Sequence, residues 1–420
     1  MGLGLGILPA IHRHLDPIIN TYVRYPALYK RQVRLINKIR KKDNISVLFV
    51  LTSLASWKTE DLYKAMKSNG RFSTDILITV ANDEDARPSL RQYLTSKGYS
   101  YFELHEGEDI YSKMTPDIIF YEKPYESYLA DENLRYDHYS KSVYCFILYA
   151  IHNSKTIPDF LFNNPLQNIA FQEYFENEDV SKEVGLYKSN KGKNNVVTGH
   201  TCFDQYLNFN KSKEIDPWKE QPTEKKRIIY APHHTIDHQH EALPYSTFLE
   251  FGDFMLSMAE KYKDRVQFAF KPHPVLKPKL EKIWGKERTD AYYKKWSELD
   301  NCQLETGTYT SLFMFSDAMI HDCGSFQIEY HYTHNPVLYL THDAETHRQT
   351  MLGFAQKAFD LHYIGQCKED IENFIQNVIN DKDSLKERRI EFFNNYLLPP
   401  TGQSASQNII DAILGEDSYK

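Results

Sequence analysis

Four histidines lie within eight positions of the segment RIIYAPHHTIDHQH, residues 227–240. Imidazoles in such a cluster could bind a metal ion, transfer protons or contact phosphate, or could belong to a solvated loop. A metal site could use His234, Asp237 and His238, but the segment contains no HExxH-type helical motif. His233 and His234 lie closest to the end of the apolar run RIIYA. We therefore expect these two histidines to contact donor phosphate groups or the acceptor, without a metal.

The string KPHP, residues 271–274, places Lys271 and His273 two positions apart beside prolines. Proline restricts the backbone, so the two side chains should meet a ligand at a fixed angle. Lysine and histidine both serve oxyanions, although a rigid surface turn could have the same sequence. We predict that Lys271 contacts a donor phosphate and that His273 takes part in catalysis.

The string HDCGS, residues 321–325, precedes a stretch that we expect to begin a helix. Backbone N–H groups and the helix dipole at Gly324 and Ser325 would suit a phosphate or diphosphate, with Asp322 beside them. Aspartate and serine are also ordinary helix caps, so this string alone does not decide between the two roles. Glu329, further along the helix, could reach the hydroxyls of a ribose or could be an exposed helical glutamate.

These strings share a position, because each begins where a predicted strand of the second half ends. RIIYA precedes PHHT, VQFAF precedes KPHP, AMI precedes HDCGS, and VLYL precedes THD. In parallel α/β sheets, ligands bind outside the carboxyl ends of the strands. We therefore expect the four loops to line one site.

Strand-like apolar runs alternate with helical stretches along the whole chain, which is typical of a parallel sheet with crossover helices. One long stretch, residues 166–186, is interpreted as a single helix. The alternation restarts at residue 227, after a polar stretch that contains two prolines. The pattern predicts an α/β protein of two Rossmann-like domains facing a cleft. The expected parts are a basic N-terminal segment (1–42), an N-terminal domain (43–207), a linker (208–226), a C-terminal domain (227–396) and a tail helix (397–420).

The composition excludes several classes of protein. A net charge of -7 gives no general electrostatic footprint for nucleic acid. The five cysteines are scattered without a CxxC pair, which favours a reducing compartment over a disulfide framework or a structural zinc site. The N-terminal residues lack the features of a secretory signal, and no apolar run reaches the length of a membrane-spanning helix. We expect a cytoplasmic protein.

One segment departs from this acidic average. Residues 22–42 contain eight lysines and arginines, no acidic residue, and interleaved apolar side chains. A basic amphipathic helix of this kind can lie on an anionic membrane surface, although a solvated helix face would have a similar composition. We expect peripheral contact with the inner face of the cell membrane.

The segment SDAMIHDCGSFQIEYHYTHNPVLYL, residues 316–340, resembles the signature of the CDP-glycerol glycerophosphotransferase family, whose members build teichoic acids and related capsule polymers. KPHP is similar to the family's Lys-x-His-Pro string, and IIYAP and GQSASQNI are similar to two further family strings. Cys323 and Gly324 replace the family's Tyr and first Ser. The positions that match the signature are Ser316, Asp317, Asp322, Ser325, Glu329 and Pro336.

This resemblance implies a GT-B type fold, with a cytidine diphosphate donor held by the C-terminal domain and an acceptor approaching from the N-terminal domain. Ser316, Asp317 and Glu329 would then contact the nucleotide. The family's general base is a histidine of the N-terminal domain. The comparable position here is His152, in YAIHNSK, where the surrounding residues do not match the family string.

We therefore expect a transferase that moves glycerol-phosphate, or another polyol-phosphate, from a CDP-linked donor to a hydroxyl of a saccharide or lipid-linked acceptor. CMP would be released, and neither a metal nor another cofactor would be required. His152, neutral near pH 7, would take the acceptor proton. The alternatives are a GT-B glycosyltransferase or epimerase that uses a UDP-sugar, a metal-dependent hydrolase built on the histidine cluster, and a non-catalytic membrane-binding partner of a capsule assembly complex.

Overall fold

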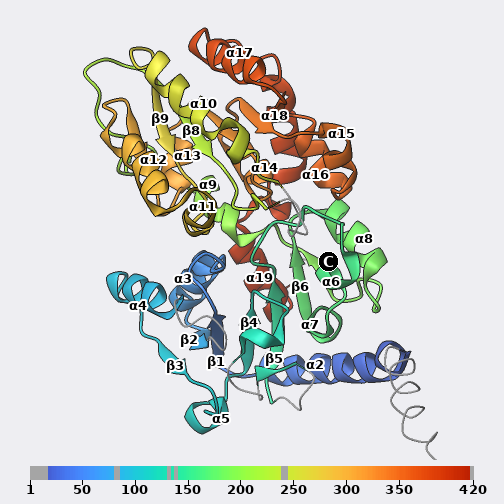
Figure 1. Cartoon of the computed structure of the whole chain (residues 1–420). Coiled ribbons are helices and arrows are strands. Elements are labelled where there is room, and N and C mark those ends of the chain that lie inside the picture. The colour runs from blue at the N-terminus through green and yellow to red at the C-terminus, as the bar shows by residue number, and fades with distance from the viewer. Residues whose placement is uncertain (1–17, 80–85, 130–133, 137–140, 238–244, 417–420) are drawn as a thin grey trace, which may run out of the picture. The chain divides into compact units, whose positions relative to one another are not determined.

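The computed structural model describes residues 18–79, 86–129, 134–136, 141–237 and 245–416 (Figure 1). The chain divides into two compact units. The first contains residues 1–204 and 398–420, and the second contains residues 205–397. Each unit has one parallel β-sheet. The α/β class predicted from the alternating pattern is therefore confirmed.

Seven parallel strands form the sheet of the first unit, in the order β3-β2-β1-β4-β5-β6-β7. Val47 and Phe49 of β1 lie in one core cluster, and Leu48 and Val50 lie in another. Such near-continuous apolar strands result when helices cover both faces of a parallel sheet. The strand bounds are β1 Ile45–Leu51, β2 Phe72–Thr79, β3 Phe102–Leu104, β4 Ile118–Tyr121, β5 Val143–Ile147, β6 Gln172–Phe175 and β7 Asn195–Val197.

The helices of the first unit include one from the C-terminal end of the chain. Asp204 holds the start of this helix, α19, because its carboxylate accepts from the backbone N–H groups of Ala405 at 2.7 Å and Ser406 at 2.9 Å. The bounds are η1 Asn20–Arg24, α2 Tyr25–Ile39, α3 Glu60–Ser68, α4 Ala86–Ser96, α5 Ile110–Lys113, η2 Glu126–Tyr128, α6 Pro158–Phe162, α7 Pro165–Ile169, α8 Glu178–Tyr187, η4 Thr201–Phe203, η7 Pro400–Gly402 and α19 Ala405–Leu414. Helix α9, Asp204–Leu207, lies where the two units meet in the sequence.

Six parallel strands form the sheet of the second unit, in the order β10-β9-β8-β11-β12-β13. Their bounds are β8 Lys226–Ala231, β9 Val266–Phe270, β10 Cys302–Leu304, β11 Ala318–His321, β12 Val337–Leu340 and β13 Tyr363–Gly365. The helices are α10 Phe248–Lys261, α11 Leu276–Trp284, α12 Lys286–Glu298, α13 Thr310–Met314, α14 Phe326–Glu329, η5 Tyr330–Thr333, α15 Ala344–Gln349, α16 Gly353–Phe359, α17 Lys368–Ile379, α18 Lys386–Phe392 and η6 Phe393–Leu397.

The stretch 166–186 is not the single helix that its sequence suggested. It contains the end of α7, then strand β6, and then most of α8. The prediction was wrong because β6 has the sequence QEYF, in which the buried residue Glu173 interrupts the apolar pattern of an interior strand. Lys188, thirteen residues beyond the end of β6, pairs with this glutamate inside the fold.

The basic helix predicted over residues 22–42 is present as η1 and α2, and α2 lies beside α7 (Figure 1). Its apolar positions Ile36 and Ile39 are buried in the core of the first unit. The exposed residues Lys30, Arg34 and Lys38 are spaced four apart, so they form one stripe along the helix. Among the described residues, no helix is long and apolar enough to cross a membrane.

Three buried histidines of the second unit should make its stability depend on pH. The rings of His321 and His331 lie 5.5 and 4.9 Å from the ring of His362, and each imidazole has one nitrogen without a hydrogen-bond partner. Burial lowers the pKa of His362 to about 3 and those of His321 and His331 well below the usual value. All three are therefore neutral when folded at pH 7.

As pH falls below about 6.5, the unfolded chain binds protons at these histidines while the folded chain does not, so the free energy of unfolding falls. Together, the three imidazoles should lower the free energy of unfolding by up to about 4 kcal/mol for each pH unit of acidification. Burial raises the pKa of Asp322 to about 6, and its protonation in the folded state offsets about a third of that slope. Urea unfolding of the intact protein between pH 7.5 and 5 would measure the slope. In His362→Gln the slope should correspond to about one proton fewer taken up on unfolding. An unchanged slope would contradict the assignment.

Candidate functional site

Three neighbouring strands of the second sheet end at the predicted loops. β8 pairs with β9 on one side and with β11 on the other. The loops that begin at Pro232, Lys271 and Asp322 therefore leave the same edge of the sheet side by side. Three of the four predicted loops are therefore neighbours, and that the loops line one ligand site stays a prediction.

His233, His234 and His273, which we call the histidine triad, lie together at this edge. Their ring centroids are 4.3 Å apart for His233 and His234, 5.2 Å for His233 and His273, and 4.2 Å for His234 and His273. One nitrogen from each ring lies within 4.8 Å of the others. The triad thus joins the PHHT and KPHP strings, while His238 lies outside the described residues.

The hydrogen bonds of the triad indicate where two of the three imidazoles carry their proton. Nδ1 of His273 accepts from the backbone N–H of Val275 at 3.2 Å, and Nδ1 of His234 accepts from Nζ of Lys279 at 3.1 Å. Nδ1 of His233 lies 2.9 Å from the hydroxyl of Thr235. A neutral imidazole that accepts at Nδ1 carries its proton on Nε2. His273 and His234 can therefore offer Nε2–H donors rather than lone pairs.

The charge state of the triad supports this assignment. Burial, together with the neighbouring histidines and Lys279, lowers the pKa of His233 to about 2 and that of His273 to about 4. Both rings are therefore neutral at pH 7. Neutral N–H donors beside lysine ammonium groups suit an oxyanion.

Two lysines supply positive charge near the triad. Lys279 of α11 contacts His234, as described above, and it was missed in the sequence. Its position in the first turn of the helix that follows KPHP was the available signal. Nζ of Lys271 donates to the carbonyl oxygen of Gly307 at 3.0 Å and lies 5.2 Å from the ring centroid of Tyr309. The structure thus places Lys271 on the loop of His273, with its ammonium group directed toward the segment before α13.

The side chain of Asp322 is directed into the protein, where it connects the loop of His233 to the start of α10. Its carboxylate accepts from the backbone N–H of His233 at 2.5 Å and from the N–H and hydroxyl of Thr247 at 2.7 and 3.0 Å. Asp322 is fully buried and sits between the end of β11, the loop of His233 and the start of α10. These contacts make it a support for the triad, with no side-chain surface directed to a phosphate.

The expected helix after HDCGS is short. Ser325 precedes α14, which has four residues and continues into the 3-10 turn η5, and the Ser325 side chain makes no capping hydrogen bond. Gly324 and Ser325 are half-buried at the end of β11, beside the loop of the triad. Glu329 is buried in α14, where it accepts from the hydroxyl of Tyr206 at 3.4 Å, rather than being an exposed helical residue.

Ser316 and Asp317 are not brought to this edge. They precede β11, so they lie at the opposite end of the strand from Asp322. The hydroxyl of Ser316 lies 2.7 Å from that of Tyr330, and a carboxylate oxygen of Asp317 accepts from the backbone N–H of Arg227 at 2.8 Å. Both side chains therefore have structural partners at the far edge of the sheet.

His152 lies in the first unit, after β5, and is paired with a glutamate. Its Nδ1 lies 3.0 and 2.9 Å from the two carboxylate oxygens of Glu176, and its backbone N–H donates to the same carboxylate at 3.0 Å. Both side chains are buried. Glu176 directly follows β6, so it lies at the carboxyl end of a parallel strand, where ligand-binding residues are expected. It was missed because β6 was interpreted as helix.

The pair changes the expected charge of His152. Burial by itself would lower the pKa of His152, but the carboxylate of Glu176 outweighs burial and raises it. Burial acts against Glu176 as well, yet His152 lowers the pKa of this carboxyl to about 2. The resting imidazole is therefore more readily protonated than the ordinary neutral histidine that we expected.

Comparison with known proteins identifies the family. A family model described as CDP-Glycerol:Poly(glycerophosphate) glycerophosphotransferase matches residues 185–415, which is more than half of the chain. The chain belongs to this family. The predicted family and the predicted enzyme class, a CDP-glycerol glycerophosphotransferase-like transferase, are thereby confirmed. No curated protein matches the chain.

Solved structures of this fold include the wall teichoic acid polymerase TagF, with a TM-score of 0.60 and 14% identity, covering 99% of this chain and 98% of TagF. A UDP-GlcNAc 2-epimerase from Neisseria meningitidis, solved with UDP-GlcNAc, has a TM-score of 0.59 and 16% identity, covering 89% of this chain and all of the other. These likenesses confirm the predicted GT-B type of fold.

Proposed function

We propose that this family member transfers glycerol-phosphate from CDP-glycerol to a hydroxyl of an acceptor and releases CMP. The observation that carries the proposal is the histidine triad, in which His234 and His273 carry protons on Nε2 near Lys279 and Lys271. This arrangement suits a diphosphate whose charge grows on the leaving group. One TagF structure was obtained after a soak with CDPG, which supports the choice of donor.

In the proposed reaction, the acceptor oxygen attacks the phosphorus that bears the glycerol. The bond from that phosphorus to the bridging oxygen breaks, and the oxygen leaves with CMP. His152 accepts the acceptor proton at Nε2 in its neutral form. The triad and the lysines stabilise the charge on the transferred and leaving phosphates, and Gly324 and Ser325 add contacts to the donor.

The test is nucleotide release by purified protein with CDP-glycerol, CDP-ribitol and a UDP-sugar offered separately beside lipid-linked acceptor. We expect CMP from a CDP-polyol. UDP release would favour the alternative of a UDP-sugar enzyme, because the same fold occurs in UDP-GlcNAc 2-epimerases. No nucleotide release with any donor would reject both readings.

We further propose that the acceptor is a saccharide or lipid-linked chain in the synthesis of a teichoic acid or capsule polymer. The name of the family and the TagF fold support this class of product. An acceptor attached to lipid would require the enzyme to work at the cytoplasmic face of the membrane. The basic stripe of α2 supports such a position.

The stripe leads to a prediction about vesicle binding. Replacing Lys30, Arg34 and Lys38 together with glutamine should weaken binding to phosphatidylserine-containing vesicles about 100-fold, since each exposed cation contributes about 1 kcal/mol at an anionic surface. Cosedimentation at physiological salt would measure this. The same triple change at Lys286, Arg288 and Lys294, which are exposed on α12, serves as the control. Equal binding by both variants would contradict the proposal.

One observation favours a second candidate, a metal-dependent hydrolase, because the triad nitrogens converge closely enough to hold an ion. The hydrogen bonds argue against it. A metal at Nε2 would require Nδ1 to carry the proton, and Nδ1 of His273 and His234 already faces the donors of Val275 and Lys279. Stoichiometric zinc or manganese in purified protein, together with hydrolysis abolished by a chelator, would establish this alternative.

A further inference from the structure

Glu176 makes more contacts with His152 than an incidental ion pair requires. The carboxylate binds both the backbone N–H and Nδ1 of His152, so it fixes the position of the residue and the rotation of the ring. The ring of Phe175 stacks on the imidazole at 4.9 Å, and that of Phe162 lies 6.0 Å away. Nε2 of His152 is buried and has no hydrogen-bond partner. Nδ1 of His152 is therefore held by Glu176, while Nε2 has no hydrogen-bond partner.

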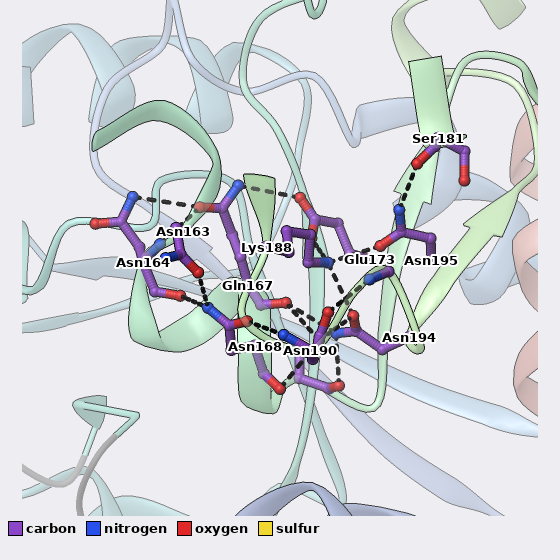
Figure 2. Close-up of polar contacts among 12 residues, drawn as sticks. Asn163, Asn164, Gln167, Asn168, Glu173, Ser181, Lys188, Asn190, Asn194 and Asn195 are labelled. Carbon is purple, nitrogen blue, oxygen red and sulfur yellow. Dashed lines mark hydrogen bonds and ion pairs between the residues drawn. The ribbon is translucent and has the colours of Figure 1, made fainter. Parts of the chain in front are cut away.

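The other charged groups near His152 largely cancel. Glu173 raises and Lys188 lowers the pKa of His152, but these two residues are paired with each other at 2.5 Å (Figure 2). His200 also faces Glu176. Its Nδ1 accepts from the N–H of Cys202 and its Nε2 lies 2.8 Å from the carbonyl oxygen of Leu148, so it is a neutral ring that donates from Nε2. Glu176 is left with His152 as its cationic partner.

We propose that Glu176 is a positioning residue for the transfer reaction, which holds His152 so that Nε2 accepts the acceptor proton and the resulting imidazolium is paired. This inference rests on the proposed function. The carboxylate keeps the Nδ1 proton in place, so the lone pair of a neutral His152 is on Nε2. The acceptor proton moves to Nε2, and Glu176 remains ionised throughout. The same arrangement of base and orienting carboxylate recurs in unrelated hydrolases.

The test uses Glu176→Gln in the full-length protein, with Glu178→Gln as the matched control. Glu178 lies two residues further on and has a 66% exposed side chain. The first readout is the NMR titration of the His152 ring, assigned with His152→Asn. The pKa of His152 should lie above 6.5 in the wild-type protein and should fall in Glu176→Gln. Glu176→Asp should restore part of the rise, and Glu178→Gln should leave it unchanged.

The second readout is CMP release as a function of pH. Activity requires neutral His152, so it is lost as pH falls through the pKa of that ring. In Glu176→Gln this acid limb should move to lower pH by the shift seen in the titration, while kcat at pH 8 falls about tenfold and KM for CDP-glycerol stays the same. A purely structural role would lower the amount of folded enzyme without moving the limb.

The outcomes separate the two proposals. If the titration of His152 is the same in Glu176→Gln, the pairing is absent and the inference is wrong. If the titration shifts but the acid limb does not follow, the limb does not report the ionisation of His152. The inference then fails together with the assignment of His152 as the base, while CMP release still supports the transfer reaction. If the wild-type protein releases no CMP, the proposed function fails, while the titration still reports whether the pair exists.

Discussion

Replacing His273 with alanine is expected to lower kcat/KM for the CDP-linked donor by about 10²–10³-fold, the effect of removing one preorganised donor from an oxyanion site. The backbone N–H of His273 donates to the carbonyl oxygen of Pro232 at 3.0 Å, and this bond survives the substitution. The loss should therefore come from the missing Nε2–H donor rather than from a collapsed loop. Steady-state release of CMP would measure it.

The pH dependence of this loss distinguishes two roles for the ring. The pKa of His273 is lowered to about 4, so the imidazole is neutral across the working range. The ratio of wild-type to variant activity should then be constant from pH 6 to pH 9. Lys282→Ala, at an exposed position of α11 in the same unit, is the control and should retain full activity. A loss confined to one limb of the profile would instead indicate acid–base catalysis by His273.

The sequence located the triad because strand ends can be recognised from apolar runs alone. RIIYA and VQFAF are interior strands of a parallel sheet, and their pairing brings His233, His234 and His273 to one edge whatever the details of the loops. The tautomers of these rings could not be predicted. They depend on Lys279 and on the backbone N–H of Val275, whose positions are determined by the turn before α11 and by that helix.

The roles of Ser316 and Asp317 and the presence of Glu176 could not be predicted correctly from the sequence. Ser316 and Asp317 match the family signature, but they precede the apolar run AMI, so the fold places them at the beginning of β11 and away from the triad. A match to a family signature therefore does not show that each matched residue lies at the site. Glu176 could not be recognised because its strand was missed. Glu173 can be buried inside β6 because it pairs with Lys188, which lies at the end of α8.

That partner leads to the largest expected effect on stability. Nζ of Lys188 is fully buried and donates to Glu173 at 2.5 Å, to Oδ1 of Asn194 at 2.8 Å and to Oδ1 of Asn195 at 2.7 Å (Figure 2). Gln167 donates to the other oxygen of Glu173 at 3.1 Å. The ammonium group thus supplies the counter-charge of Glu173, and it shares Oδ1 of Asn194 with the side-chain amide of Asn190, which donates to that oxygen at 2.7 Å.

Lys188→Met should lower the free energy of unfolding by about 3–5 kcal/mol, because it leaves the Glu173 carboxylate buried without a counter-charge. Urea unfolding at pH 7.5 would measure this loss. Lys182→Met, on the exposed face of α8 with a side chain 75% exposed, should change the free energy of unfolding by no more than about 0.5 kcal/mol.

The double variant Lys188→Met with Glu173→Gln shows why the ion pair is present. Removing both charges should recover much of the lost stability, since a buried ion pair contributes little net free energy once its desolvation is counted. If the double variant is as unstable as Lys188→Met, the cost lies in the lost hydrogen bonds to Asn194 and Asn195 and not in the carboxylate. The titration of His152 should be unchanged in this double variant, because Glu173 and Lys188 act on its pKa in opposite directions. A changed titration would contradict that cancellation.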